Sequence, residues 1–194
     1  MACREFLRKP CLLRIKENEF LLWGFSYHRQ EVIVARMILV GDSLKVSELF
    51  LPPSTYILEW SWAQRGETFF FYGRHIQNSS DEWLDRHIGK NVVFTYDTAT
   101  GVFEQVLDMQ CTLGIESPVY VVCMCVSSDQ KYLLLGSRDE LLVVDFIAKK
   151  HLHTVHIQYL SSLTFIRDDT ELVVGTWEYL HIVKFEDLLQ MDKL

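Results

Sequence analysis

The clearest pattern of apolar and polar positions lies between Val119 and Ile157, where short apolar runs alternate with polar segments. The polar segments contain Ser and Asp, whose side chains accept hydrogen bonds from nearby backbone N–H groups in tight turns. The pattern predicts four short strands joined by turns, over residues 119–126, 132–137, 141–146 and 151–157.

These runs are apolar at nearly every position, not at every second position. A sheet with one face in water shows alternation, so we expect both faces of this sheet to be buried. Short connections favour antiparallel neighbours. Four-stranded antiparallel sheets that bury both faces are typical of the stacked blades of a β-propeller. The predicted fold class is therefore all-β, built from such blades.

The same pattern recurs at a fixed distance. Gly136 and Gly175 are 39 residues apart, and so are Phe146 and Phe185. Three further strands are predicted over residues 162–166, 171–175 and 179–185. After Phe185 the sequence favours a short helix, so the last unit is predicted to lack an outer strand.

Two earlier units share this frame. In each, a span of 13 residues has a polar middle and ends in an apolar run and a glycine: Cys11–Gly24, Trp60–Gly73 and Cys123–Gly136. We predict a single propeller-like domain over residues 1–194 with an insertion at 75–90. Its blade-like units are approximately 10–51, 56–110, 119–157 and 158–190.

Several short motifs resemble the WD40 repeat family. Ser127-Ser128-Asp129 stands where that family has its first hairpin turn, and Gly136-Ser137-Arg138-Asp139 resembles its Gly-Ser-x-Asp turn. Val144-Asp145 and Tyr96-Asp97 take the place of the Trp-Asp dipeptide, and the segment 97–101 resembles the Asp-x-x-Thr-Gly turn. The chain has no Gly-His pair and no Trp-Asp dipeptide. The repeats are therefore degenerate.

The resemblance implies a β-propeller that acts as a scaffold for protein–protein interaction, without catalysis. It also implies a second possibility, the substrate-recognition part of a ubiquitin ligase of the F-box/WD or cullin-associated type, with ligase subunits as partners. An enzyme built on a propeller is the alternative from another class. Four units are fewer than the family's usual number. We therefore expect an incomplete ring or a fragment of a larger propeller. A small four-bladed ring, closed by a strand from residues 3–8, is the alternative.

The charge balance narrows the range of partners. The net charge is −7, which argues against nucleic acid and against anionic membranes as partners. No apolar stretch is long enough to span a membrane, and no signal peptide is recognisable. We expect an intracellular protein, in the cytoplasm rather than the nucleus.

Two cysteines and three histidines raise the possibility of a metal or catalytic site in the third unit. Cys123 and Cys125 are two residues apart on one predicted strand, and they precede His151, His153 and His156. Zinc sites place their cysteines on turns with two intervening residues, and this spacing differs. A thiol on an inner strand is inaccessible to a substrate. We therefore predict no metal, no cofactor and no catalytic residue, and regard both thiols as core.

The insertion at 75–90 contains the candidate partner-binding residues. Residues 82–88 are predicted to form a short helix that presents Trp83, Leu84 and Ile88. These side chains either fold onto the blade or anchor a partner, because tryptophan is enriched at binding hot spots.

Other aromatic residues lie inside the repeat frame, and we assign them to the core: Trp23, Trp60, Trp62, Phe69, Phe70 and Phe71. His181, in the middle of a predicted strand, is assigned to the core as well.

Overall fold

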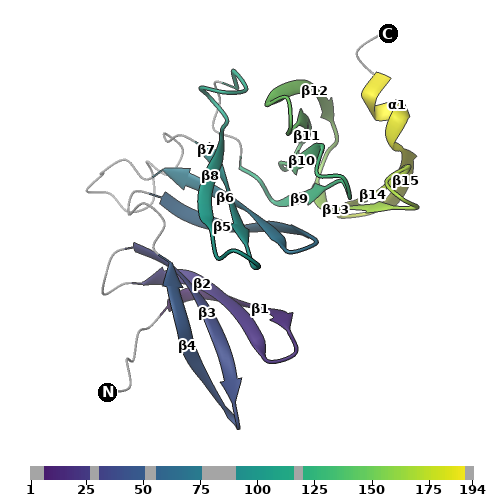
Figure 1. Ribbon diagram of the computed structural model, residues 1–194. Coiled ribbons are helices and arrows are strands. Elements are labelled where there is room, and N and C mark those ends of the chain that lie inside the picture. The colour runs from purple at the N-terminus through teal and green to yellow at the C-terminus, as the bar shows by residue number, and fades with distance from the viewer. Residues whose placement is uncertain (1–6, 27–30, 51–55, 76–90, 116–119, 191–194) are drawn as a thin grey trace. The chain divides into compact units, whose positions relative to one another are not determined.

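The computed structural model describes residues 7–26, 31–50, 56–75, 91–115 and 120–190 (Figure 1). These residues form strands almost throughout, which confirms the predicted all-β class. The chain divides into two compact units, Met1–Leu58 with Gly73–Gly89, and Glu59–Tyr72 with Lys90–Leu194. The expectation of one domain over residues 1–194 stays a prediction. No helix in the described ranges has the length and apolar character needed to cross a membrane.

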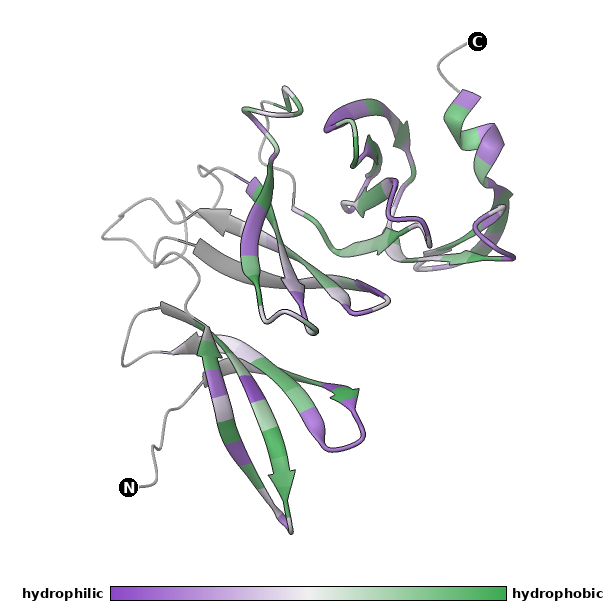
Figure 2. Ribbon diagram, viewed as in Figure 1, coloured by the Kyte–Doolittle hydropathy of each residue, from purple (hydrophilic) through white to green (hydrophobic). Residues whose placement is uncertain are grey.

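The first unit contains an antiparallel sheet in the order β1 (Leu7–Lys16), β2 (Glu19–Ser26), β3 (Glu31–Val40) and β4 (Ser43–Phe50). One row of cross-strand neighbours on this sheet consists of Leu12, Leu22, Ala35 and Leu49. Exposed apolar side chains extend this face beyond that row, and Figure 2 shows apolar residues along β3 to its tip. Arg36 and Glu19 form an ion pair on the other face.

The next sheet, most of which belongs to the second unit, has the order β5 (Tyr56–Arg65), β6 (Thr68–His75), β7 (Asn91–Asp97) and β8 (Phe103–Asp108). The turn after β7 follows the predicted Asp-x-x-Thr-Gly pattern. Oδ1 of Asp97 accepts hydrogen bonds from the backbone N–H groups of Ala99 and Thr100 and from the Thr100 hydroxyl group. Gly101 has a φ of 73°, a conformation that glycine adopts without a steric penalty.

The next sheet is the one predicted most clearly from the sequence. Its order is β12 (Lys150–His156), β11 (Glu140–Asp145), β10 (Tyr132–Gly136) and β9 (Cys123–Val126). Leu133 and Leu135 belong to one apolar core, shared with the β5–β8 sheet. Leu134, between them, belongs to a second core, shared with the following sheet. Burial on both faces is therefore confirmed, and it explains why the strands are apolar at consecutive positions.

The last sheet has three strands, β13 (Leu160–Ile166), β14 (Glu171–Thr176) and β15 (Leu180–Lys184). Helix α1 (Phe185–Gln190) follows β15 directly, and the expected absence of an outer strand from this unit is confirmed in the described residues. Residues 7 and 8 belong to β1 and pair with β2, and the expectation that residues 3–8 complete the β13–β15 sheet stays a prediction. Residues 3–6 lie outside the described residues.

The strand pairing reproduces the 39-residue repeat position by position. Gly136 faces Leu141 in the β10–β11 pair, and Gly175 faces Leu180 in the β14–β15 pair. A Cβ atom on Gly136 would lie 2.5 Å from Cδ2 of Leu160 and 2.6 Å from Sγ of Cys123. On Gly175 it would meet the hydroxyl group of Ser162. Both glycines thus let a neighbouring side chain approach the backbone.

The core assignments made from the sequence are largely correct. Trp23 and the run Phe69–Phe71 are buried, and Trp62 is half-buried, whereas Trp60 belongs to the residues whose side chains are not described. The assignment of His181 to the core is wrong, because its side chain is exposed. The reason is its place in β15, a strand at the edge of its sheet.

Candidate partner-binding surface

Trp83, Leu84 and Ile88 lie in residues 76–90, outside the described residues, so their role as a partner anchor stays a prediction. The described residues instead show an exposed group of aromatic side chains at one end of the second unit. We call Arg138, Tyr159, Trp177 and Tyr179 the aromatic surface. Trp177 is 72% exposed, Tyr179 64% and Tyr159 39%.

Three connections from two adjacent sheets supply this surface. Arg138 lies in the turn between β10 and β11, Tyr159 joins β12 to β13, and Trp177 lies in the turn between β14 and β15. Arg138 and Trp177 are 39 residues apart, so they occupy the same turn position in consecutive units. The repeat itself thus brings a cation and an aromatic ring to one end of the strands.

The rings and the guanidinium group are in contact. The ring centroids of Tyr159 and Trp177 are 5.2 Å apart with an interplanar angle of 24°, a stacked arrangement. Cζ of Arg138 lies 5.3 Å from the Tyr159 centroid and 5.8 Å from the Trp177 centroid. Both distances fall within the range of cation–π attraction.

Backbone hydrogen bonds hold these connections in place. The N–H of Leu160 donates to the carbonyl oxygen of Arg138, and the N–H of Ile157 donates to that of Asp139. In the next turn, the N–H of Thr176 donates to the carbonyl oxygen of Tyr179, whose own N–H donates to Oγ1 of Thr176. The surface is therefore largely ordered before any partner arrives, which lowers the entropic cost of binding.

Tyr159 has a strained backbone, with a φ of 58°. A non-glycine residue in this region carries a conformational cost, and such residues cluster at functional sites. Asp139 and Glu178, which follow Arg138 and Trp177 in the sequence, are exposed acidic residues. The surface thus combines tryptophan, tyrosine and arginine, the residue types that are enriched in protein-binding hot spots.

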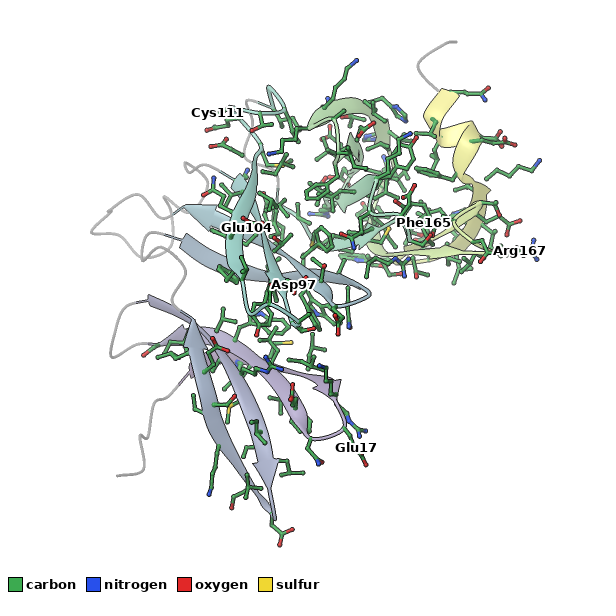
Figure 3. The ribbon with its side chains drawn as sticks, in the orientation of Figure 1. Glu17, Asp97, Glu104, Cys111, Phe165 and Arg167 are labelled. Carbon is green, nitrogen blue, oxygen red and sulfur yellow. The ribbon has the colours of Figure 1, made fainter. Side chains whose placement is uncertain are left out.

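A separate hydrogen-bonded link lies at the other end of the strands, where β9 turns into β10 and β13 turns into β14. Oδ2 of Asp169 accepts hydrogen bonds from the N–H and the hydroxyl group of Ser128, and Oδ1 lies 3.9 Å from Nη2 of Arg65. Arg167, Asp168 and Asp169 all have positive φ, so this turn is strained (Figure 3 labels Arg167). The link connects the end of β5 with one turn in each of the next two sheets and has a structural role.

The cysteines of β9 are placed as core. Burial raises the pKa of the Cys123 thiol to about 12 and also raises that of Cys125, where burial is the largest cause. Both thiols belong to or pack against the core between the last two sheets. They stay protonated near neutral pH and are poor nucleophiles. In the described part of the chain, no group of three or more His, Cys, Asp or Glu residues is arranged to hold a metal ion.

The aromatic surface was not predicted from the sequence. Hydrophobicity alone assigns tryptophan to a core, and the exposure of Trp177 follows only from its place in a turn. A signal was nevertheless present: Gly175-Thr176-Trp177-Glu178 stands 39 residues after Gly136-Ser137-Arg138-Asp139. An aromatic residue at a turn position of a repeat indicates an exposed ring.

Comparison with known proteins gives the fold but no family. No family model matches the chain, and no curated protein matches it. Hydrazine synthase from Kuenenia stuttgartiensis has a similar structure, with a TM-score of 0.62 and 12% identity over 86% of this chain. A gluconolactonase from Xanthomonas campestris has a TM-score of 0.51 and 12% identity over 95% of the chain. The chain spans 55% and 59% of the lengths of these two proteins.

Both are propeller-like all-β folds. The fold of this chain is that of β-propeller blades. At 12% identity the likeness concerns the fold alone. Each antiparallel sheet of the second unit corresponds to one blade. The β9–β12 blade buries both faces, and the β13–β15 blade has three strands.

Proposed function

We propose that this chain is a protein–protein interaction scaffold built of WD40-like blades, and that the aromatic surface is a place where it holds a partner protein. The observation that carries the proposal is the stack of Arg138, Tyr159 and Trp177, with residue Trp177 72% exposed. An indole so exposed contributes little to folding, whereas tryptophan, tyrosine and arginine are enriched among the few residues that carry most of the binding energy of protein interfaces.

The partner is a protein rather than a nucleic acid or a membrane. The chain carries a net charge of −7, which disfavours binding to phosphate groups. Asp139 and Glu178, which follow Arg138 and Trp177 in the sequence, are exposed and would repel an anionic polymer. A protein surface can place basic side chains against these carboxylates and apolar side chains against the rings.

We propose that the chain has no catalytic activity of its own. The two similar structures carry the names of enzymes, but the likeness at 12% identity concerns the fold. Cys125 is buried and Cys123 is half-buried, and burial raises the pKa of both thiols, so neither offers a thiolate to a substrate.

Affinity capture with single-residue variants tests the proposal. The tagged chain is incubated with cell extract, and the retained proteins are quantified by mass spectrometry for the wild type, Trp177→Ala and Ile147→Ala. Ile147 is the matched control, because it is 68% exposed in the turn between β11 and β12, at the other end of the strands. We expect at least one retained protein to fall about tenfold or more with Trp177→Ala and to stay unchanged with Ile147→Ala.

Trp83→Ala separates the two candidate surfaces. If this variant loses the retained proteins and Trp177→Ala does not, binding lies in the insertion and the aromatic surface is excluded. Thermal unfolding is measured for every variant. Trp177→Ala should change the free energy of unfolding by no more than about 0.5 kcal/mol, since the indole is exposed. A large loss of stability would mean that the ring has a structural role instead.

A further inference from the structure

The outer edge of β15 has no strand beside it in the described residues, although the β5–β8 and β9–β12 sheets each have a fourth strand. Helix α1 begins at Phe185, immediately after β15, and packs through Phe185 and Leu188 against the core between the last two sheets. Leu180 is 68% exposed and Ile182 58%, so neither side chain is covered.

The hydrogen-bonding pattern shows which backbone groups this edge presents. The N–H of Thr176 donates to the carbonyl oxygen of Tyr179 at one end of the β14–β15 pair. At the other end, the N–H of Phe185 donates to the carbonyl oxygen of Thr170. In an antiparallel pair, bonded and non-bonded positions alternate. Leu180, Ile182 and Lys184 are therefore the non-bonded positions, and their N–H and C=O groups point away from β14.

The neighbouring blade shows what a strand at this position looks like. β12 pairs antiparallel with β11, placing Lys150 opposite Asp145 and His153 opposite Val143. The 39-residue repeat equates Asp145 with Lys184 and Val143 with Ile182. The acidic residue that faces Lys150 in one blade is thus a basic residue in the other.

We propose that β15 binds an extended segment of another protein, which pairs antiparallel with its free edge and places a carboxylate opposite Lys184. The segment completes the blade as β12 completes the neighbouring one. The unpaired backbone groups supply the hydrogen bonds of strand addition, and the charge at Lys184 selects an acidic residue at that position. This inference concerns a different surface from the aromatic one and does not depend on the proposed function.

Fluorescence anisotropy with a synthetic peptide tests this inference. The probe has the sequence of residues 150–157 with Lys150→Glu and carries fluorescein at its N-terminus. We expect saturable binding to the full chain and about threefold to tenfold weaker binding of the same peptide with the original lysine. Lys184→Glu in the chain should reverse this preference. Absence of saturable binding would overturn the inference, and so would equal affinities of the two peptides for both the wild-type chain and Lys184→Glu.

Two variants of one residue test the backbone contribution. Ile182→Pro removes an outward N–H and should weaken probe binding about fivefold or more, whereas Ile182→Thr keeps the N–H and should preserve most of the affinity. If Ile182→Pro does not fold, N-methylation of the probe at the His153 position removes the corresponding hydrogen bond from the other side. Unchanged affinity after either change excludes strand addition. A wild-type dimer in light scattering that Ile182→Pro dissociates, without probe binding, would assign the edge to a second copy and overturn the inference.

Discussion

Asp169 and Ser128 are 41 residues apart in sequence, yet one carboxylate oxygen of Asp169 accepts hydrogen bonds from both the N–H and the hydroxyl group of Ser128. The pair ties the β13–β14 turn to the β9–β10 turn of the preceding blade. Because the acceptor is charged and only 18% exposed, these bonds are stronger than those between neutral groups.

Asp169→Asn tests this link. The substitution keeps the shape of the side chain and tolerates the positive φ, but it removes the charge. We expect a loss of about 1–2 kcal/mol in the free energy of unfolding, measured by urea denaturation. Asp168→Asn is the control, because Asp168 also has a positive φ but its side chain is exposed. Equal losses in the two variants would show that the link contributes nothing.

The repeating glycines give a second prediction. Gly136→Ala places a methyl group against Leu160, which is fully buried, and against Cys123, which packs on the same core, so the side chains must shift within a packed interior. We expect destabilisation of about 1–3 kcal/mol, measured as a lower Tm. Gly175→Ala should cost less, because the obstructing group is the hydroxyl of Ser162, an exposed side chain that can rotate. The reverse order would contradict this packing.

Acid stability depends on the turn at Asp97. Hydrogen bonds from the backbone and side chain of Thr100 lower the pKa of the Asp97 carboxyl group from its usual value of 3.8. A lowered pKa in the folded state means that the contribution to stability is present above pH 3.8 and is lost as the pH falls through the folded-state pKa. Asp97→Asn should therefore reduce the drop in Tm between pH 6 and pH 3. An unchanged drop would show that this turn does not take part in acid unfolding.

Thiol accessibility gives a further prediction. Cys111 is exposed, whereas Cys125 is buried and Cys123 is partly buried. Burial raises the pKa of the thiols of Cys123 and Cys125. At pH 8, iodoacetamide should modify Cys111 within minutes, and Cys123 and Cys125 only as the chain opens. Peptide mapping by mass spectrometry follows each site. Rapid modification of Cys125 in the folded chain would mean that the core between the last two blades is loose.

The sequence predicts the third blade well. Residues 132–137 and 141–146 correspond to β10 and β11 within one residue at each end, because uninterrupted apolar runs bounded by Ser and Asp turns are a strong local signal. The first of its strands is shorter than predicted: β9 begins at Cys123, not at Val119, and residues 116–119 lie outside the described ones.

The binding surface could not be predicted in the same way. Hydropathy treats Trp177 and Trp23 alike, although one is 72% exposed and the other 1%. What separates them is position, since Trp177 lies in a turn and Trp23 in β2. His181 was misplaced for a related reason, because a residue in mid-strand is buried only if another strand covers that edge of the sheet.

The uneven burial of the blades has a consequence for cooperativity. Among the described residues, the β9–β12 blade is packed on both faces, whereas the β13–β15 blade is packed on one face and open along β15. In repeat architectures, stability is close to a sum of terms between adjacent units, so a terminal unit can open while the inner ones stay folded. Amide protons of β15 should accordingly exchange with solvent far sooner than those of β10. A segment bound along the edge of β15 would slow this exchange, in a region that otherwise opens independently of the inner blades.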